Sequence, residues 1–170
     1  ISKADKIVLP GVGSIKDGIR ELQRLQLINQ LNEAVINDKK PFLGICLGMQ
    51  LIAKKSFENG ETKCLGWVDA DVIKFNFTDK KNSLKVPHVG WNSVIYKNKC
   101  SLYDGIPNDS DFYFVHSYHY KLYEDVSTGE TIHGDKFTSS IQKNNIYGFQ
   151  FHPEKSQKAG LKIISNFLNL

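Results

Sequence analysis

The feature that most constrains the fold is a change of periodicity at Cys46, within the stretch PFLGICLGMQLIA (residues 41–53). Residues up to Ile45 form a short apolar run bounded by Pro41, which is typical of a buried strand. From Leu47 the apolar residues recur at the spacing of a core-facing helix. The stretch therefore predicts a buried strand that passes directly into a helix, with Cys46 at the junction.

The flanking sequence extends this pattern of strands and helices. Residues 4–13 read as a short strand with a glycine loop, and residues 14–37 as a helix with Ser14 as its N-cap. Several β-branched and aromatic runs follow, at residues 67–77, 86–96, 111–120 and 137–154, before helical spacing returns at residues 159–170. This order predicts an α/β fold, an open and mostly parallel sheet flanked by helices, with a β-rich second half.

Composition limits the other possibilities. The 170 residues, 41% of them hydrophobic, suit one domain over residues 1–170, and the net charge of +4 comes from scattered lysines, so we expect no nucleic-acid partner. Three widely spaced cysteines indicate neither a disulfide framework nor a metal site, which favours the cytoplasm and no cofactor. No apolar stretch approaches the ~20 residues of a membrane span. Because the chain enters a strand soon after Ile1, we expect an N-terminal strand and helix to be missing.

Cys46 is the first candidate catalytic residue. With Gly44 and Gly48 it matches the G-x-nucleophile-x-G elbow, in which a tight strand-to-helix turn exposes the nucleophile. At a helix N-terminus the helix dipole favours the reactive thiolate. The alternative is a small apolar residue packed under the sheet, and the elbow motif alone supports both interpretations equally.

His152 and Glu154 are the second and third candidates. Pro153 between them favours an extended segment, in which residues two apart project to the same side. Glu154 could then orient the imidazole of His152 toward a sulfur, as covalent acyl transfer requires. A surface histidine beside a solvated glutamate is the alternative, but the combination with an elbow cysteine favours catalysis.

Acyl transfer also needs donors for an oxyanion. The backbone N–H of Leu47, directly after the nucleophile, is one candidate. The loop LPGVG (residues 9–13) offers another, because Gly11 and Gly13 allow a peptide to turn its N–H toward a ligand. A plain strand-to-helix turn would explain the same glycines.

Three of these motifs, LPGVG (9–13), LGICLGMQ (43–50) and GFQFHPE (148–154), resemble the class I glutamine amidotransferases. PHVGWN (87–92) and FYFVHSY (112–118) narrow the resemblance to the glutaminase subunits of imidazole glycerol phosphate synthases. The similarity runs in order along essentially the whole chain. It implies an enzyme of histidine biosynthesis that hydrolyses glutamine through a cysteine thioester.

The resemblance also implies residue roles. Cys46 would attack the glutamine side-chain amide, His152 would protonate the departing ammonia and then activate water, and Glu154 would orient His152. Further residues would hold glutamine or complete the oxyanion hole: Leu47, Val12, Gly13, Gly48, Gln50, Ser117 and Tyr118. Four others would lie where ammonia passes to a synthase (cyclase) subunit in a one-to-one heterodimer: Trp91, Asn92, Tyr113 and Lys155.

The family places a further requirement on the glycine loop, which must reorient when the partner is engaged. Glycines on both sides of Val12 make such a peptide flip inexpensive. A related amidotransferase subunit that supplies ammonia for aminating surface-polysaccharide sugars has very similar motifs, so the sequence leaves that alternative open.

Three other interpretations are less favoured. A cysteine esterase or peptidase would not need the Gly-Met-Gln that follows the elbow, and an inactive docking module would not need all three catalytic residues. A metal site built from His88, His116, His119 and His133 is disfavoured because His116 and His119, three apart on one strand, should face opposite sides.

Overall fold

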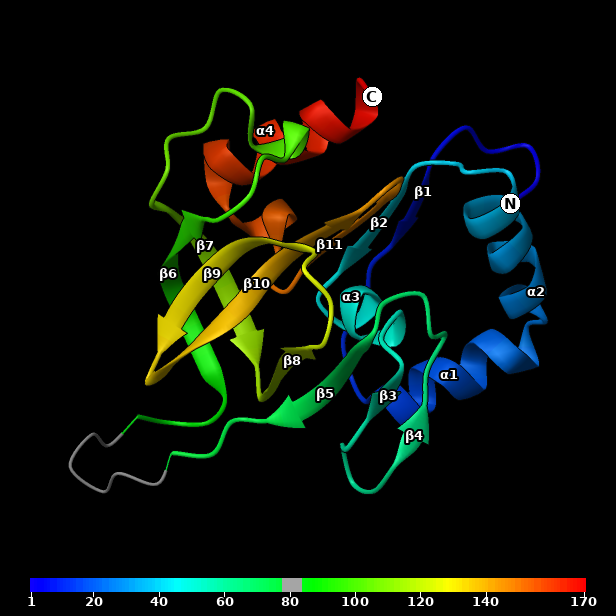
Figure 1. Cartoon of the computed structure of the whole chain (residues 1–170), viewed down its shortest axis with the longest axis horizontal. Coiled ribbons are helices and arrows are strands. Elements are labelled where there is room, and N and C mark those ends of the chain that lie inside the picture. Colours follow the sequence, from blue (N-terminus) through cyan, green and yellow to red (C-terminus); the bar gives the residue numbers. More distant parts are fainter. Residues whose placement is uncertain (78–83) are drawn as a thin grey trace.

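The computed structural model describes residues 1–77 and 84–170. Three neighbouring parallel strands form the part of the sheet next to the N-terminal helices (Figure 1). They are β1 (Ile7–Leu9), β2 (Phe42–Ile45) and β11 (Ile146–Phe149), with β2 in the middle. All four residues of β2 are buried, as predicted for the run before Cys46. Apolar residues on both faces of this strand are possible because helices or strands cover each side.

The remaining strands extend this core into one curled, mixed sheet (Figure 1). They are β3 (Lys55–Ser56), β4 (Thr62–Lys63), β5 (Ala70–Lys74), β6 (His88–Tyr96), β7 (Ser110–His116), β8 (Tyr118–Leu122), β9 (Ser127–His133) and β10 (Asp135–Lys143). Apart from the short β3–β5 pair, their pairings are antiparallel. The α/β class is confirmed, but the sheet is less parallel than expected, because short turns can join only antiparallel neighbours.

The first predicted helix is divided into three segments: α1 (Ile15–Arg24), α2 (Leu27–Asn32) and a π-helical turn (Glu33–Asn37). Ser14 is the N-cap of α1, as predicted, and accepts a 3.2 Å hydrogen bond from the backbone N–H of Asp17. Gln26 adopts a left-handed backbone with φ of 54° and separates α1 from α2. The interruption turns Leu25, which helical spacing placed in the core, toward solvent.

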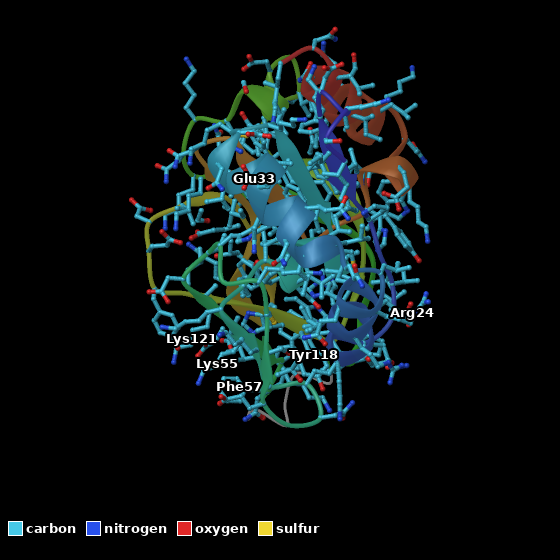
Figure 2. All side chains as sticks on the ribbon, turned by 90° about the vertical axis from the view of Figure 1, so that its right-hand side faces the viewer. Arg24, Glu33, Lys55, Phe57, Tyr118 and Lys121 are labelled. Atoms are coloured by element: carbon cyan, nitrogen blue, oxygen red, sulfur yellow. The ribbon has the colours of Figure 1, made fainter. Side chains whose placement is uncertain are left out.

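Two apolar layers lie on opposite faces of the parallel strands. One contains α1, α2 and α3 (Leu47–Leu51), packed against side chains such as Phe42 and Ile146. The other contains α4 (Gln157–Leu168) and β7, packed against Leu43 and Phe149. Figure 2 views the molecule from the α1–α2 side, where Arg24 and Glu33 are exposed on the outer surface of the helical layer.

Two short 3₁₀ turns complete the chain, at Ser101–Tyr103 and at Pro153–Lys155. Within the described ranges, no helix is both long and apolar enough to cross a membrane.

Candidate active site

Cys46 lies at a sharp turn between β2 and α3. Its backbone has φ of 51° and ψ of −105°, a conformation that non-glycine residues rarely adopt and that costs on the order of 1–3 kcal/mol. Its N–H donates a 2.7 Å hydrogen bond to the carbonyl of Phe149 in β11. The neighbouring strand thus holds the nucleophile in the strained geometry of an elbow.

The two elbow glycines are required by close backbone contacts. A Cβ on Gly48 would lie 1.7 Å from the carbonyl oxygen of Leu9, and a Cβ on Gly44 would lie 2.8 Å from the carbonyl of Gly48. Real Cβ atoms do not approach so closely, so α3 can pack here only through glycine. Gly48 therefore allows the close packing of α3 against β1, and its role in glutamine binding stays a prediction from the resemblance.

The sulfur of Cys46 is buried and close to two polar groups. The thiol points to the carbonyl oxygen of Val115 at 3.9 Å, and Nε2 of Gln150 donates toward Sγ at 3.7 Å. Burial raises the pKa of Cys46 to about 11, although the backbone N–H of Leu47 acts in the opposite direction. The helix N-terminus does favour the thiolate, as predicted, through the Leu47 N–H, but desolvation by burial has the larger effect on the pKa of Cys46.

His152 and Glu154 are joined as predicted, but by a different backbone. Nδ1 of His152 lies 2.7 Å from a carboxylate oxygen of Glu154. His152 itself is extended, whereas Pro153–Lys155 forms a 3₁₀ turn rather than the extended segment expected from the proline. Proline suits the first position of such a turn because no N–H is needed there.

The second ring nitrogen of His152 is available for chemistry. Nε2 is buried, and within the described residues it has no hydrogen-bond partner. Nor does a hydrogen bond join it to Cys46, whose thiol faces Val115 instead. Catalytic hydrogen bonds are often loose before substrate binds, so this arrangement is compatible with a resting acid–base pair.

One of the predicted oxyanion donors is already engaged. The N–H of Leu47 donates to the carbonyl of Gly11 at 3.3 Å, so the glycine loop occupies the position that an oxyanion would take. In that loop Val12 is 75% exposed, and Gly13 has φ of 106°, which favours glycine. An oxyanion hole at this site therefore requires the loop to move.

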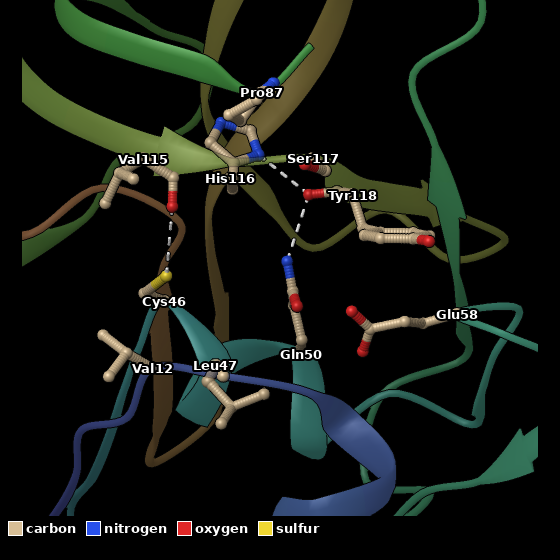
Figure 3. A pocket seen from close by; sticks show the side chains of 11 residues that line it. Val12, Cys46, Leu47, Gln50, Glu58, Pro87, Val115, His116, Ser117 and Tyr118 are labelled. Atoms are coloured by element: carbon tan, nitrogen blue, oxygen red, sulfur yellow. Dashed lines mark hydrogen bonds between the residues drawn. The ribbon is translucent and has the colours of Figure 1, made fainter.

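A cavity of about 330 Å³ opens above Cys46 (Figure 3). Besides Cys46, its lining includes six residues singled out from the sequence: Val12, Gly13, Leu47, Gln50, Ser117 and Tyr118. The side-chain amide of Gln50 donates to the Tyr118 carbonyl at 3.0 Å and to the Gln150 side chain at 2.9 Å. Gln50 thereby links α3 to the strand on the opposite side of the cavity.

Sequence reasoning gave no role to two polar residues close to the substrate cavity and the sulfur, Glu58 and Gln150. Glu58 lines the cavity (Figure 3). One of its carboxylate oxygens accepts a 2.7 Å hydrogen bond from the N–H of Ile15. Nothing in the sequence distinguishes it from the nearby Glu61. Gln150 lies within the quoted GFQFHPE motif, and its contact with the sulfur depends on the pairing of β11 with β2, which the motif does not reveal.

Three of the four residues expected near an ammonia passage gather on one surface. Trp91 and Tyr113 are cross-strand neighbours with ring centroids 6.0 Å apart, and Nζ of Lys155 lies 6.0 Å from the Tyr113 ring. Asn92 projects from the opposite face of β6 and its side chain lies 3.2 Å from His88.

The four histidines of the disfavoured metal site lie around Phe75. His116 and His119 both contact this ring, with centroids at 5.3 and 4.5 Å, so the expectation that they face opposite sides is wrong. The reason is a break at Ser117, between β7 and β8, which resets the alternation. Among the described residues, no group of three or more His, Cys, Asp or Glu side chains is arranged to hold a metal ion.

Known proteins share this sequence pattern. The family model "Glutamine amidotransferase class-I" matches residues 2–170. The chain belongs to the class I glutamine amidotransferases. It is 46% identical over its whole length to imidazole glycerol phosphate synthase subunit HisH 1 of Campylobacter jejuni, covering 83% of that protein. It is 48% identical to subunit HisH of Methanocaldococcus jannaschii, with 98% of this chain and 81% of that protein covered.

Solved structures support the amidotransferase fold. A crystal structure of a glutamine amidotransferase superposes with a TM-score of 0.69 and 17% identity, covering 97% of this chain and 78% of that one. PurLQS from Thermotoga maritima superposes with a TM-score of 0.68 and 17% identity, covering 99% and 81%. At these identities the likeness concerns the fold alone.

The buried thiol of this amidotransferase predicts a distinctive pH profile for alkylation. Only the thiolate reacts, and with a pKa of about 11 its fraction at neutral pH is very small. We expect the iodoacetamide rate at Cys46 to rise about tenfold per pH unit without levelling off below about pH 10. Peptide mass spectrometry would separate Cys46 from Cys64 and Cys100, with the urea-unfolded chain as reference. A plateau near pH 8 would show that the thiolate is already stabilised at rest.

Proposed function

We propose that this chain is the glutaminase subunit of an imidazole glycerol phosphate synthase. The observation that carries the proposal is the elbow cysteine, placed at a cavity and in a chain that is 46% identical over its full length to a synthase subunit of this name. The proposal places the chain in histidine biosynthesis, and no comparable observation favours amination of a polysaccharide sugar.

The chemistry follows from the buried thiol. Because the pKa of Cys46 is raised to about 11, the proton leaves the sulfur as Sγ attacks the glutamine amide carbon, and Nε2 of His152 is the unpartnered acceptor for it. The tetrahedral intermediate collapses when His152 returns the proton to the departing ammonia, leaving a glutamyl thioester. His152 then takes a proton from water, whose oxygen attacks the thioester carbon. The C–S bond breaks, glutamate is released, and His152 returns the proton to the sulfur of Cys46. Glu154 keeps Nδ1 of His152 fixed throughout.

Glutamine recognition uses charge on one side of the cavity. The carboxylate of Glu58 is suited to the α-ammonium group of the substrate, because an ion pair in a partly enclosed cavity is weakly screened. Gln50, Ser117 and Tyr118 form the adjoining wall. The side-chain amide of glutamine would then extend toward Cys46.

Control resides in the glycine loop, residues 10–13. While the carbonyl of Gly11 accepts the N–H of Leu47, that donor cannot stabilise an oxyanion, and losing one such donor typically costs on the order of 100-fold to 1000-fold in rate. We propose that docking of a synthase subunit, in a one-to-one complex in the cytoplasm, releases this contact. Ammonia would leave past Trp91, Tyr113 and Lys155, which border the same face of β6 and β7.

Growth without histidine tests the pathway. We expect deletion of this gene to abolish growth without histidine, and an intact plasmid copy, but not a copy with Cys46→Ala, to restore it. Unimpaired growth of the deletion strain would contradict a role in histidine biosynthesis. It would favour instead the alternative, a subunit that supplies ammonia for aminating surface-polysaccharide sugars. Restoration by the Cys46→Ala copy would contradict the thioester mechanism.

Glu58→Gln tests substrate recognition. The substituted side chain at position 58 retains an oxygen that can accept the N–H of Ile15 but has lost the negative charge. We therefore expect the KM for the substrate glutamine to rise about tenfold or more, with little change in kcat. The measurement is steady-state glutaminase kinetics of the complex with the synthase subunit. Glu61→Gln is the matched control, because Glu61 is an exposed partner of Lys55. Equal effects of both substitutions would remove Glu58 from the binding site.

Gly13→Pro tests the loop. Proline fixes φ near −65°, whereas Gly13 has φ of 106°, so the variant cannot present the loop peptides as glycine does. We expect stimulation of glutaminase activity by the synthase subunit to fall about 100-fold or more. Gly105→Pro, at a position with φ of 76° away from the cavity, controls for general backbone strain. Full stimulation of Gly13→Pro would refute the loop mechanism.

A further inference from the structure

A chain of directed hydrogen bonds crosses the interior between β6 and the glutamine cavity. Nδ2 of Asn92 lies 3.2 Å from Nε2 of His88, and Nδ1 of His88 lies 3.1 Å from Nε2 of His116. Nδ1 of His116 then lies 2.8 Å from the carbonyl oxygen of Tyr118. Both histidines are almost fully buried, and His116 and Tyr118 line the cavity.

The proton positions along this chain are determined by its last acceptor. A carbonyl can only accept, so His116 carries its hydrogen on Nδ1, and in the neutral ring Nε2 must accept from Nδ1–H of His88. Nε2 of His88 in turn accepts from the amide of Asn92. Burial lowers the pKa of His88 to about 4 and that of His116 to about 3, so both rings are neutral at physiological pH.

The amide of Asn92 is equally constrained. Its Oδ1 accepts the N–H of Ser93 at 2.9 Å, while Nδ2 donates to the carbonyl of Ile132 at 2.9 Å and has one hydrogen left for His88. Every donor in the chain therefore points from β6 toward the cavity. A single arrangement of protons satisfies all the groups, which distinguishes this chain from an ordinary aromatic cluster.

At the cavity, the chain meets the helix that carries the nucleophile. The Tyr118 carbonyl accepts from both His116 and Gln50 (Figure 3). Gln50 continues to Gln150, whose amide approaches the sulfur of Cys46. The bond from His116 also spans Ser117, the cavity residue between β7 and β8, and so restrains the backbone turn that forms this wall.

We propose that His116, supported by His88, is a positioning residue for glutamine: the neutral pair holds the Tyr118 carbonyl and the Ser117 turn in the geometry that the substrate needs. The inference rests on the proposed glutaminase function. His88 and His116 lie within the motifs PHVGWN and FYFVHSY, but the resemblance gave neither histidine a role in the reaction. Neither imidazole takes part in proton transfer. The expected consequence of losing the pair is weaker substrate binding with an intact nucleophile.

Labelling of Cys46 separates these effects. A diazo ketone analogue of glutamine must bind in the cavity before it alkylates the sulfur, whereas iodoacetamide needs only access to the thiolate. For His116→Ala we expect the half-saturating concentration of the analogue to rise about tenfold, with the iodoacetamide rate at Cys46 changed less than about twofold. If the unaltered chain shows no saturable labelling by the analogue, the proposed function itself fails, before any variant is compared.

Three variants exclude a merely structural role. His116→Asn retains an N–H donor near the Nδ1 position and should recover part of the binding, whereas His116→Phe fills the volume without a donor and should behave like alanine. His119→Ala removes another imidazole packed on Phe75. His119 bonds to the Tyr120 carbonyl and is not part of the hydrogen-bond chain from Asn92 to Tyr118, so this variant should leave labelling unchanged. Equal effects of His116→Ala and His119→Ala, or no recovery with asparagine, would overturn the proposal.

The coupling and the tautomers can be measured directly. If His88 acts through His116, the double variant His88→Ala/His116→Ala should bind the analogue no more weakly than His116→Ala alone. Additive losses of affinity would contradict the proposal that His88 acts through its hydrogen bond to His116. Nitrogen NMR of the folded protein should show both rings neutral with the hydrogen on Nδ1. A hydrogen on Nε2 of either ring would refute the assignment in the unaltered protein.

Discussion

The close packing of α3 against β1 is the contact on which the site depends. The backbone of Gly48 approaches the carbonyl of Leu9 so closely that any side chain would force the two elements apart. Overpacking of this kind costs on the order of 1–3 kcal/mol even where side chains can adjust, and here the obstacle is backbone. This contact fixes the first turn of α3, while the bond from Cys46 N–H to Phe149 fixes the last residue before it. The strained backbone of Cys46 is held between these two restraints.

Burial of the nucleophile has a chemical consequence. A short helix offers few aligned N–H groups, and their effect on Cys46 is smaller than the cost of placing a thiolate among apolar side chains. The raised pKa of Cys46 therefore favours the thiol over the thiolate at neutral pH. In the mechanism that we propose, activation comes with the substrate, through proton transfer to the unpartnered nitrogen of His152 as the new bond forms.

Local sequence patterns predicted the parts of this site that depend on local geometry. The strand before Cys46, the glycines around it and the cap at Ser14 follow from periodicity and short-range sterics, and each is present. The break at Gln26 and the 3₁₀ turn after His152 were not predicted, because tertiary packing decides between backbone states of similar energy. The same holds for the orientation of His119, since the interruption at Ser117 carries no sequence signal.

Residues that act through contacts between distant parts of the sequence could not be predicted, for a different reason. Glu58 enters the cavity because the loop between β3 and β4 meets the start of α1, a contact between positions 43 residues apart. Gln150 reaches the sulfur across 104 residues. No periodicity encodes such distances, and only the assembled sheet brings these groups together.

The two walls of the cavity differ in how firmly they are built. On the side of Ser117 and Tyr118, every hydrogen-bonding group along the histidine chain has a partner, and a fully satisfied buried network resists rearrangement. On the side of the glycine loop, a single 3.3 Å bond between Leu47 and Gly11 blocks the oxyanion position, and Val12 is exposed. Breaking one long hydrogen bond costs little compared with disrupting the network. On the proposed mechanism, a partner therefore switches catalysis through the loop while the wall proposed to recognise glutamine stays in place. Substrate binding and turnover would then be controlled by separate parts of one cavity.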